Sequence, residues 1–175
     1  MRRSWAVETA ANPAVLRIHV AHQLTDRTIV TSPPAELAMP LAGLLELEAV
    51  RTIDLHRYRI RVNLSPSGER EATVEHVRQI LAPAWGADAT LEADPGPRAF
   101  EAAHRADRVV AESAEMALGE PVLEALFRIE GVSEAIAGDG LVLVRLGPLF
   151  SWSTAEPEIA DALGAYERNS RDGMP

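Results

Sequence analysis

The residue types that most often perform catalysis or bind metal ions are few in this sequence, and their spacing suits neither task. The chain contains five histidines and no cysteine. His19 and His22 lie three positions apart near the end of a predicted strand, where side chains alternate between faces, so we do not expect them to bind one metal ion together. No serine stands in a Gly-x-Ser-x-Gly context, and no glycine-rich loop is suited to holding a phosphate. These residues therefore predict no catalytic site, no metal site and no cofactor.

Composition excludes further classes of site. All 17 basic side chains are arginine. Without lysine the chain forms no Schiff base and has no Walker-type phosphate lysine. Without cysteine it has no disulfide, no thiolate zinc site and no iron–sulfur cluster ligated by this chain alone.

Length and hydropathy predict a folded cytoplasmic protein that does not bind membranes. The chain has 175 residues, of which 47% are hydrophobic, and a mean hydropathy of −0.04. Arg2 and Arg3 are followed by SWAVE, which contains an acid and does not begin the apolar run of a signal peptide. Every apolar stretch is interrupted well before the roughly 18 residues that a membrane span requires.

The chain contains two copies of one pattern. Residues 26–30 (DRTIV) recur at 107–111 (DRVVA), an offset of 81, and residues 59–64 (RIRVNL) match 141–146 (LVLVRL) at an offset of 82. The alternative is a chance alignment of apolar positions in a chain rich in Ala, Leu and Val. The near absence of gaps favours a tandem repeat.

Each copy has the same predicted order of strands and helices. Period-2 alternation indicates half-buried strands, and apolar residues at helical spacing indicate amphipathic helices. In the first copy the predicted strands cover residues 16–20, 28–31, 50–55 and 58–64, and the predicted helices cover 39–47 and 71–81. The first segment of the second copy, residues 98–103, is compatible with a strand or a helix. The predicted fold class is α+β: two tandem β-β-α-β-β-α modules, mainly antiparallel sheet with helices on one face.

Proline and glycine mark the predicted boundaries between these modules. Residues 82–97 contain three prolines and two glycines and have little periodic pattern. We expect a first module at 1–85, a linker at 86–97, a second, divergent module at 98–167 and a frayed tail at 168–175.

Short segments of both copies resemble a known family. Residues 7–18 (VETAANPAVLRI) place Asn12 and Pro13 just before the first predicted strand, residues 121–132 (PVLEALFRIEGV) open the corresponding helix of the second copy, and Trp152 precedes the last predicted helix. These segments resemble the N-terminal domain of the Nfu/NifU-type iron–sulfur scaffold family, in two tandem copies. The resemblance implies that Asn12 and Pro13 form the family's turn motif and that the chain works in iron–sulfur cluster assembly. The family's separate cluster-binding domain, with its Cys-x-x-Cys pair, is absent here, so the chain would not ligate a cluster itself.

The predicted hairpins carry different side chains on their outer faces. In the first copy, a two-residue turn at 56–57 pairs Asp54 with Arg59 and places Arg61 on the same outer face. In the second copy, a predicted type II′ turn at 138–139 makes the matching outer positions apolar. These positions are Ile136, Leu141 and Leu143.

Because residues 141–144 (LVLV) are apolar on both faces, both faces require cover. Either another part of the chain buries the outer face, or this face binds a second copy or another protein. The candidate interaction surface therefore comprises Ile136, Leu141 and Leu143, together with Arg59 and Arg61 of the first copy.

The two halves differ in charge. Residues 1–85 have a net charge of +1, and residues 86–175 have a net charge of −10. This acidity disfavours nucleic acid, because phosphates would be repelled. The acidic half is either a solvated surface or a docking surface for the first copy, within one chain or between two molecules.

Taken together, these features predict a non-enzymatic accessory or adaptor protein of iron–sulfur cluster assembly that acts by protein interaction. The alternative is a general protein-interaction or oligomerisation module unrelated to iron, and an enzyme with a pocket between the copies is a third interpretation. The expected partners are an iron–sulfur carrier or client protein, or a second copy in a homodimer. We expect no nucleic-acid and no membrane partner.

Overall fold

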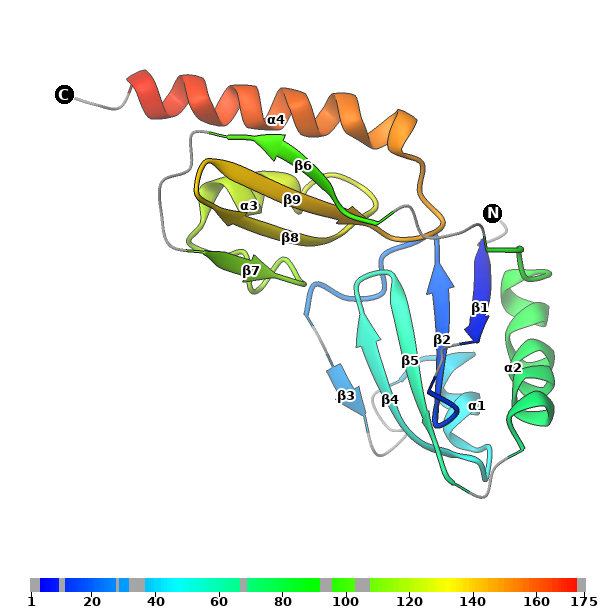
Figure 1. Ribbon diagram of the computed structural model, residues 1–175. Coiled ribbons are helices and arrows are strands. Elements are labelled where there is room, and N and C mark those ends of the chain that lie inside the picture. The colour runs from blue at the N-terminus through cyan, green and yellow to red at the C-terminus, as the bar shows by residue number, and fades with distance from the viewer. Residues whose placement is uncertain are drawn as a thin grey trace. The chain divides into compact units, whose positions relative to one another are not determined.

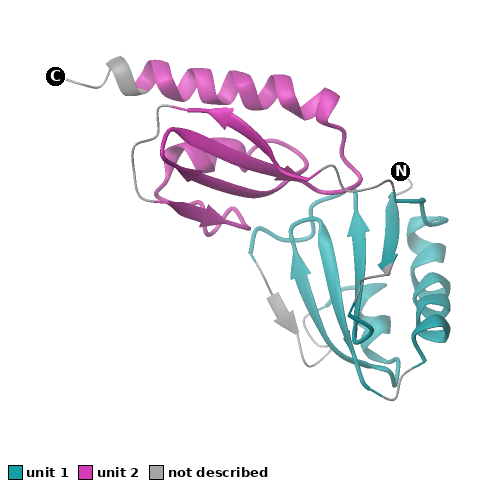
Figure 2. Ribbon diagram, in the orientation of Figure 1, with its two compact units in different colours: residues 1–92 teal, residues 93–175 magenta. Residues whose placement is uncertain are grey.

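The chain divides into two compact units, Met1–Glu92 and Ala93–Pro175, here called unit 1 and unit 2 (Figure 2). The computed structural model describes residues 4–9, 12–27, 29–31, 37–66, 69–91, 96–102 and 108–172.

In its described residues, unit 1 forms a five-stranded antiparallel sheet with the order β1-β2-β5-β4-β3 (Figure 1). Its strands are β1 (Trp5–Thr9), β2 (Val15–Val20), β3 (Ile29–Thr31), β4 (Val50–His56) and β5 (Arg59–Leu64), and its helices are α1 (Leu41–Leu45) and α2 (Arg70–Trp85). Both helices pack on one face of this sheet, the inner face; the opposite face is called the outer face.

Unit 2 repeats this arrangement. Its described residues form a four-stranded antiparallel sheet with the order β6-β9-β8-β7. The strands are β6 (Arg98–Glu101), β7 (Val109–Ala111), β8 (Val132–Gly138) and β9 (Leu141–Leu146), and the helices are α3 (Pro121–Leu126) and α4 (Trp152–Asp172). Here too both helices pack on one face of the sheet.

The sheet orders confirm the predicted fold class. With β1 set aside, each unit has the element order β-β-α-β-β-α, and in each sheet the fourth strand pairs with both the first and the third. The offset of 82 holds in the hairpins, where Asp54 pairs with Arg61 and Ile136 with Leu143. It does not hold for the short second strands: Val30 pairs with Asp54 and Val110 with Ile136, an offset of 80 where the sequence alignment used 81.

Alternation along the strands builds one core in each unit. In unit 1 the inner face contributes Leu16, Ile18, Ile53, Ile60 and Val62, which pack against helical residues such as Leu44, Val77 and Leu81. In unit 2 the inner face contributes Ala135, Ala137, Val142 and Val144. Helix α4 covers them with a stripe at helical spacing, Trp152, Ala155, Ile159 and Leu163.

Strand β1 was not predicted: the sequence analysis began the first module with the strand at residues 16–20. Tertiary contacts hold it in place. The Trp5 indole is fully buried, and its Nε1 donates a hydrogen bond of 2.8 Å to the carbonyl of Gly86, just beyond α2. The Trp5 and Trp85 rings meet edge to face, with their centroids 6.4 Å apart.

Several helices differ in extent from the prediction. Helix α2 covers residues 70–85 where 71–81 were expected. Helix α1 covers only residues 41–45 of the expected 39–47. The segment that was compatible with a strand or a helix, residues 98–103, contains the strand β6 at 98–101. Helix α4 continues to Asp172, so five residues of the segment that we expected to be frayed, 168–172, are helical.

The first hairpin turn lies one residue further along the chain than predicted. The loop consists of Arg57 and Tyr58, and Asp54 therefore pairs with Arg61 instead of Arg59. The correction shifts every pair by two residues, so the face assigned to each side chain is unchanged.

The second hairpin turn shows the same shift. The loop consists of Asp139 and Gly140, with φ values of 51° and 78°, which is the geometry of a type I′ turn and not the predicted type II′ turn. Asp-Gly is a favoured sequence for type I′ turns because both central residues have positive φ and the turn matches the strand twist. Ile136 consequently pairs with Leu143.

None of the helices within the described residues is long and apolar enough to cross a membrane.

Candidate functional site

The outer faces of the two sheets occupy equivalent places in the fold but carry different side chains. On the unit 1 sheet, one row of backbone partners crosses four strands: Glu8 pairs with Arg17, Arg17 with Arg61, and Arg61 with Asp54. Two of these three neighbouring pairs join opposite charges, and the third joins the two arginines. This is a polar surface.

The charged side chains of this surface contact one another. Arg17 Nη1 lies 2.8 Å from Glu8 Oε1, and Arg61 Nε lies 3.9 Å from Asp54 Oδ2. Asn63 Nδ2 donates hydrogen bonds to Thr52 Oγ1 at 2.8 Å and to Asp54 Oδ2 at 3.3 Å. The network is thus held between neighbouring strands of one sheet, and the acids on it are already engaged.

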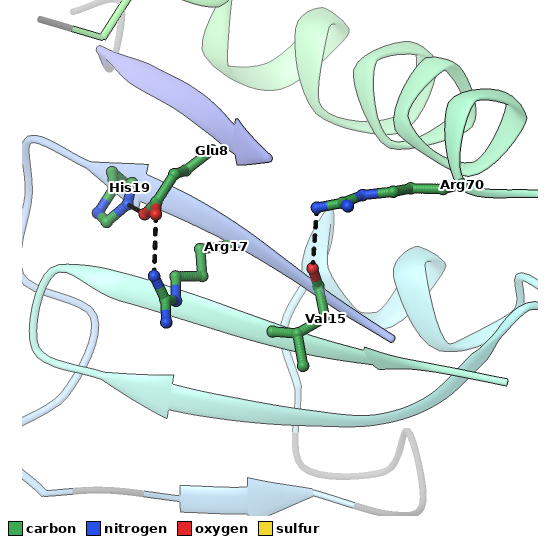
Figure 3. A network of polar contacts seen from close by, with 5 residues as sticks. All are labelled: Glu8, Val15, Arg17, His19 and Arg70. Carbon is green, nitrogen blue, oxygen red and sulfur yellow. Dashed lines mark hydrogen bonds and ion pairs between the residues drawn. The ribbon is translucent and has the colours of Figure 1, made fainter. Parts of the chain in front are cut away.

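His19 is the buried member of the network (Figure 3). Its Nε2 lies 2.7 Å from Glu8 Oε2, and no partner for its buried Nδ1 is found in the described part of the chain. Burial lowers the pKa of His19, and the charges of Arg59 and Arg17 act in the same direction, against the opposing effect of Glu8. The histidine is therefore neutral at pH 7, with Nε2 as the donor to Glu8.

Two further titratable groups respond to this environment. Burial raises the pKa of Glu8, but the hydrogen bonds and charges of His19 and Arg17 outweigh it and hold the pKa below its ordinary value. Burial also lowers the pKa of His56, assisted by Arg59 and opposed by Asp54. At one end of the same sheet, Arg70 Nη2 donates a 3.3 Å hydrogen bond to the Val15 carbonyl, which ties the start of α2 to β2 (Figure 3).

The unit 2 sheet has an apolar row where unit 1 has the charged row. The row consists of Ala99, Leu143, Ile136 and Val110, which are successive backbone partners across β6, β9, β8 and β7. The side chains of Leu143 and Val110 are 36% and 37% exposed, and the neighbouring Leu141 is 46% exposed. Neither helix of unit 2 covers this row, because both helices pack on the inner face.

Register shows that the apolar row replaces charges position by position. Arg61 pairs with Arg17 on one side and with Asp54 on the other, and Leu143 pairs in the same way with Ala99 and Ile136. Ala99 therefore occupies the place of Arg17. In the same way, Leu143 occupies the place of Arg61, and Ile136 that of Asp54.

Charged residues lie on both sides of the apolar row. Towards the hairpin turn, Leu141 pairs with Glu101 on β6 and with Gly138 on β8. Arg108 lies beside Gly138, since a Cβ built on this glycine would be 3.2 Å from the Arg108 Cα. On the other side of the row, Arg145 Nε lies 3.2 Å from Glu134 Oε2. The surface is apolar in its centre and charged at its margins.

The structure brings together part of the candidate surface predicted from sequence. Ile136, Leu141 and Leu143 lie on the outer face of unit 2, whereas Arg59 and Arg61 lie on that of unit 1. Within its own unit, Arg61 contacts Asp54.

The predicted turn motif lies between β1 and β2. The side chain of Asn12 accepts a 2.9 Å hydrogen bond from the backbone N–H of Ala14, and its carbonyl accepts one from Val15, with Pro13 inside the turn.

Sequence reasoning missed two members of the apolar row and the partner of His19. Ala99 was missed because residues 98–103 were ambiguous between strand and helix, and Val110 because an offset of 81 aligned it with Ile29. Glu8 was missed because β1 was not recognised. The usable signal was the alternation in the sequence VVA at 109–111, whose first and last residues face the core.

Among the described residues, no group of three or more His, Cys, Asp or Glu side chains is placed to hold a metal ion. Comparisons with family models, with curated proteins and with solved structures found no match for this chain.

Proposed function

We propose that this chain is a non-enzymatic protein-interaction module whose binding surface is the outer face of unit 2. The observation that carries the proposal is the apolar row, Ala99, Leu143, Ile136 and Val110, left uncovered by the helices of its own unit. Exposed contiguous apolar surface with a polar margin is typical of protein-binding sites.

The contrast between the units supports this assignment. Unit 1 uses the same fold to present a face of paired charges, so the fold itself does not require an apolar outer face. Exposed Leu and Val side chains have no stabilising role towards the core of their own unit. A binding partner that removed them from water would stabilise the complex by about 25 cal/mol per Å² of apolar surface buried.

The context we propose is iron–sulfur cluster assembly, in the cytoplasm. It rests on the resemblance of residues 7–18 and 121–132 to Nfu/NifU-type N-terminal domains. In this role the chain is an accessory or adaptor that binds a cluster carrier or a client protein, and it does not ligate the cluster because it has no cysteine. Membranes and nucleic acids are not among the proposed partners.

A general interaction or oligomerisation module, unrelated to iron, is the second candidate. It is favoured by the location of the proposed surface, which lies entirely on one sheet face and requires no residue of the resembling turn motif, Asn12 and Pro13.

An anaerobic pull-down with the full chain from its native extract tests the proposal. Leu143→Asp places a charge in the apolar row, and Leu118→Asp makes the same change at a leucine that is 70% exposed outside the sheet. We expect iron–sulfur carriers or clients to be captured by the wild type and by Leu118→Asp but not by a folded Leu143→Asp. Capture that is equal in all three would refute the surface, and capture lost only in Leu143→Asp without iron–sulfur proteins would favour the second candidate.

A further inference from the structure

We infer that the outer face of unit 2 binds a second copy of this chain, sheet against sheet, about a two-fold axis that runs parallel to the strands between β8 and β9. The inference rests on the proposed function, since it names an occupant for the same surface. It is carried by the pairing of sizes and charges that this axis produces.

The surface is described by three rows that cross the four strands in the order β6, β9, β8, β7. The turn row is Glu101, Leu141, Gly138 and Arg108; the apolar row is Ala99, Leu143, Ile136 and Val110; and the far row includes Arg145 and Glu134 on the two central strands. Successive rows are two residues apart along each strand, roughly 7 Å.

A two-fold axis parallel to the strands keeps each row opposite its own copy and reverses the order of the strands. Strand β9 then faces β8 of the second copy, and β6 faces β7. In the apolar row, Leu143 meets Ile136 of the second copy and Ala99 meets Val110. In the turn row, Leu141 meets Gly138 and the backbone of Arg108 beside it. In the apolar row, side chains of similar size therefore face each other at the centre and small ones face each other at the edges, which favours close packing.

The same operation pairs opposite charges at both margins. Arg108 meets Glu101 of the second copy in the turn row. In the far row, the ion pair that Arg145 forms with Glu134 within one chain faces the same pair of the second copy in reverse order, so that each arginine lies opposite a glutamate. Because the interface is isologous, each pair occurs twice. Face-to-face sheets are rotated by about 30°, which moves the marginal rows sideways by only about half a row spacing, within reach of arginine side chains.

The other two-fold axis in the plane of the interface, perpendicular to the strands, pairs the side chains poorly. It exchanges the turn row with the far row, so that Leu141 meets the Arg145 guanidinium and Gly138 meets Glu134 of the second copy. An apolar side chain would be set against a charge, and Ala99 would face only another Ala99. Complementarity thus selects one arrangement of the two copies.

Charge reversal across the interface tests this arrangement, because Arg108 and Glu101 cannot reach each other within one chain. They lie on opposite edge strands, three strand spacings or roughly 14 Å apart. The measurement is the mass in solution by analytical ultracentrifugation over a range of concentrations of the full chain. We expect the wild type to form a dimer of twice 18.9 kDa.

Arg108→Glu alone and Glu101→Arg alone each create two like-charge pairs in the dimer and should weaken it at least about ten-fold. An equimolar mixture of these two variants restores both opposite pairs in a heterodimer and should regain the affinity of the wild type. The double variant Arg108→Glu/Glu101→Arg should also regain it as a homodimer. Leu143→Asp should be monomeric, whereas Leu118→Asp should dimerise like the wild type.

A wild type that remains at 18.9 kDa at every concentration would overturn the inference, as would a dimer that Leu143→Asp leaves intact. A dimer lost in Leu143→Asp, with a mixture of the two charge variants that stays monomeric, would overturn the arrangement of the copies. The proposed function is tested separately. If the chain is monomeric but captures another protein through Leu143, the dimer is refuted and the proposed function is retained.

Discussion

The Glu8 carboxylate links β1 to β2 by accepting hydrogen bonds from two side chains of the second strand. Arg17 bonds to one oxygen at 2.8 Å and His19 to the other at 2.7 Å. A buried histidine whose second nitrogen has no acceptor in the described part of the chain is a poor site for a second proton. The neutral imidazole is therefore the form that the folded protein stabilises.

Acidification should consequently destabilise unit 1. The folded-state pKa values of His19 and His56 lie below the ordinary value of 6.5, so as the pH falls through 6.5 the unfolded chain takes up protons that the folded chain does not. The contribution of these two histidines to the free energy of unfolding is therefore complete above this pH and is lost progressively below it. Glu8, whose pKa is held below 4.5, adds a loss of the same sign at lower pH.

Urea unfolding at about pH 7.5 and about pH 5.5 measures this effect through the transition midpoint. We expect the midpoint to fall on acidification, and to fall less in His19→Gln, which keeps a donor for Glu8 but does not titrate. His76→Gln, at an exposed position on α2, is the matched control and should behave like the wild type. An identical fall in His19→Gln and the wild type would contradict the role of His19.

Two glycines of unit 2 allow the cost of backbone strain to be separated from the cost of a steric clash. Gly119 and Gly131 have nearly the same φ, 88° and 91°, but a Cβ at Gly119 meets nothing within 4 Å, whereas one at Gly131 lies 2.6 Å from Cγ of Phe150. We expect Gly119→Ala to lower the free energy of unfolding by about 1 kcal/mol. Gly131→Ala should cost clearly more in the same denaturant titration, and equal losses would show that Phe150 moves aside freely.

At the scale of the element, the two faces of strand β9 lie in different environments. Val142 and Val144 are fully buried in the core of unit 2, while Leu141 and Leu143 are on the outer face. The strand is apolar throughout, but only alternate side chains are required for folding. The structure thus answers for unit 2 itself a question that the sequence left open, since its own helices do not cover the outer face.

Substitutions on the two faces of β9 should therefore change the free energy of unfolding by different amounts. Val144→Ala removes buried methyl groups and should lower the free energy of unfolding by roughly 2 kcal/mol. Leu143→Ala should change it by less than about 0.5 kcal/mol when measured at concentrations where the chain is monomeric. Denaturant unfolding by circular dichroism reports both values, and a large loss in Leu143→Ala would mean that the outer face is part of a core.

At the scale of the whole molecule, the described residues form two hydrophobic cores that share no residue. The core of unit 1 is built from β1 to α2, and that of unit 2 from β6 to α4. A compact unit with its own core is expected to unfold as a cooperative unit of its own.

Core substitutions should therefore act on one unit at a time. Ile60→Ala, at a fully buried position of β5, should increase amide hydrogen exchange throughout residues 5–85 and leave that of residues 98–172 unchanged. Ile159→Ala, at a fully buried position of α4, should give the reciprocal pattern. Hydrogen exchange with mass spectrometry resolves the two regions, and protection lost in both units from either substitution would contradict independent unfolding.

Local sequence pattern was sufficient to predict most elements. Alternation of Leu16, Ile18 and Val20 with polar residues, and the helical spacing of Val74, Val77 and Leu81, predicted β2 and α2 because burial on one face imposes these periods. The duplicated order of elements followed from the repeat. The apolar character of Ile136, Leu141 and Leu143 at outer positions was also readable, because a two-residue error in register does not change the face.

Other features were decided only by contacts between distant residues. The five residues of β1 become a strand because Trp5 enters the core beside Trp85 and Glu8 binds Arg17 and His19, and none of these contacts is local in sequence. The hairpin pairings depended on which two residues form the turn. In the second hairpin these are Asp139 and Gly140, which both have positive φ.

The sequence by itself therefore determined the periodicities, the repeat and the absence of thiol and amine chemistry, since these follow from residue types and short spacings. Only the tertiary structure decided which residues share a row. Ala99 and Val110 are more than ten residues apart from each other and from Ile136 and Leu143, yet they form one line across four strands. Sheet order and register create such a row, and both depend on the free energy of the whole folded unit rather than on any one segment.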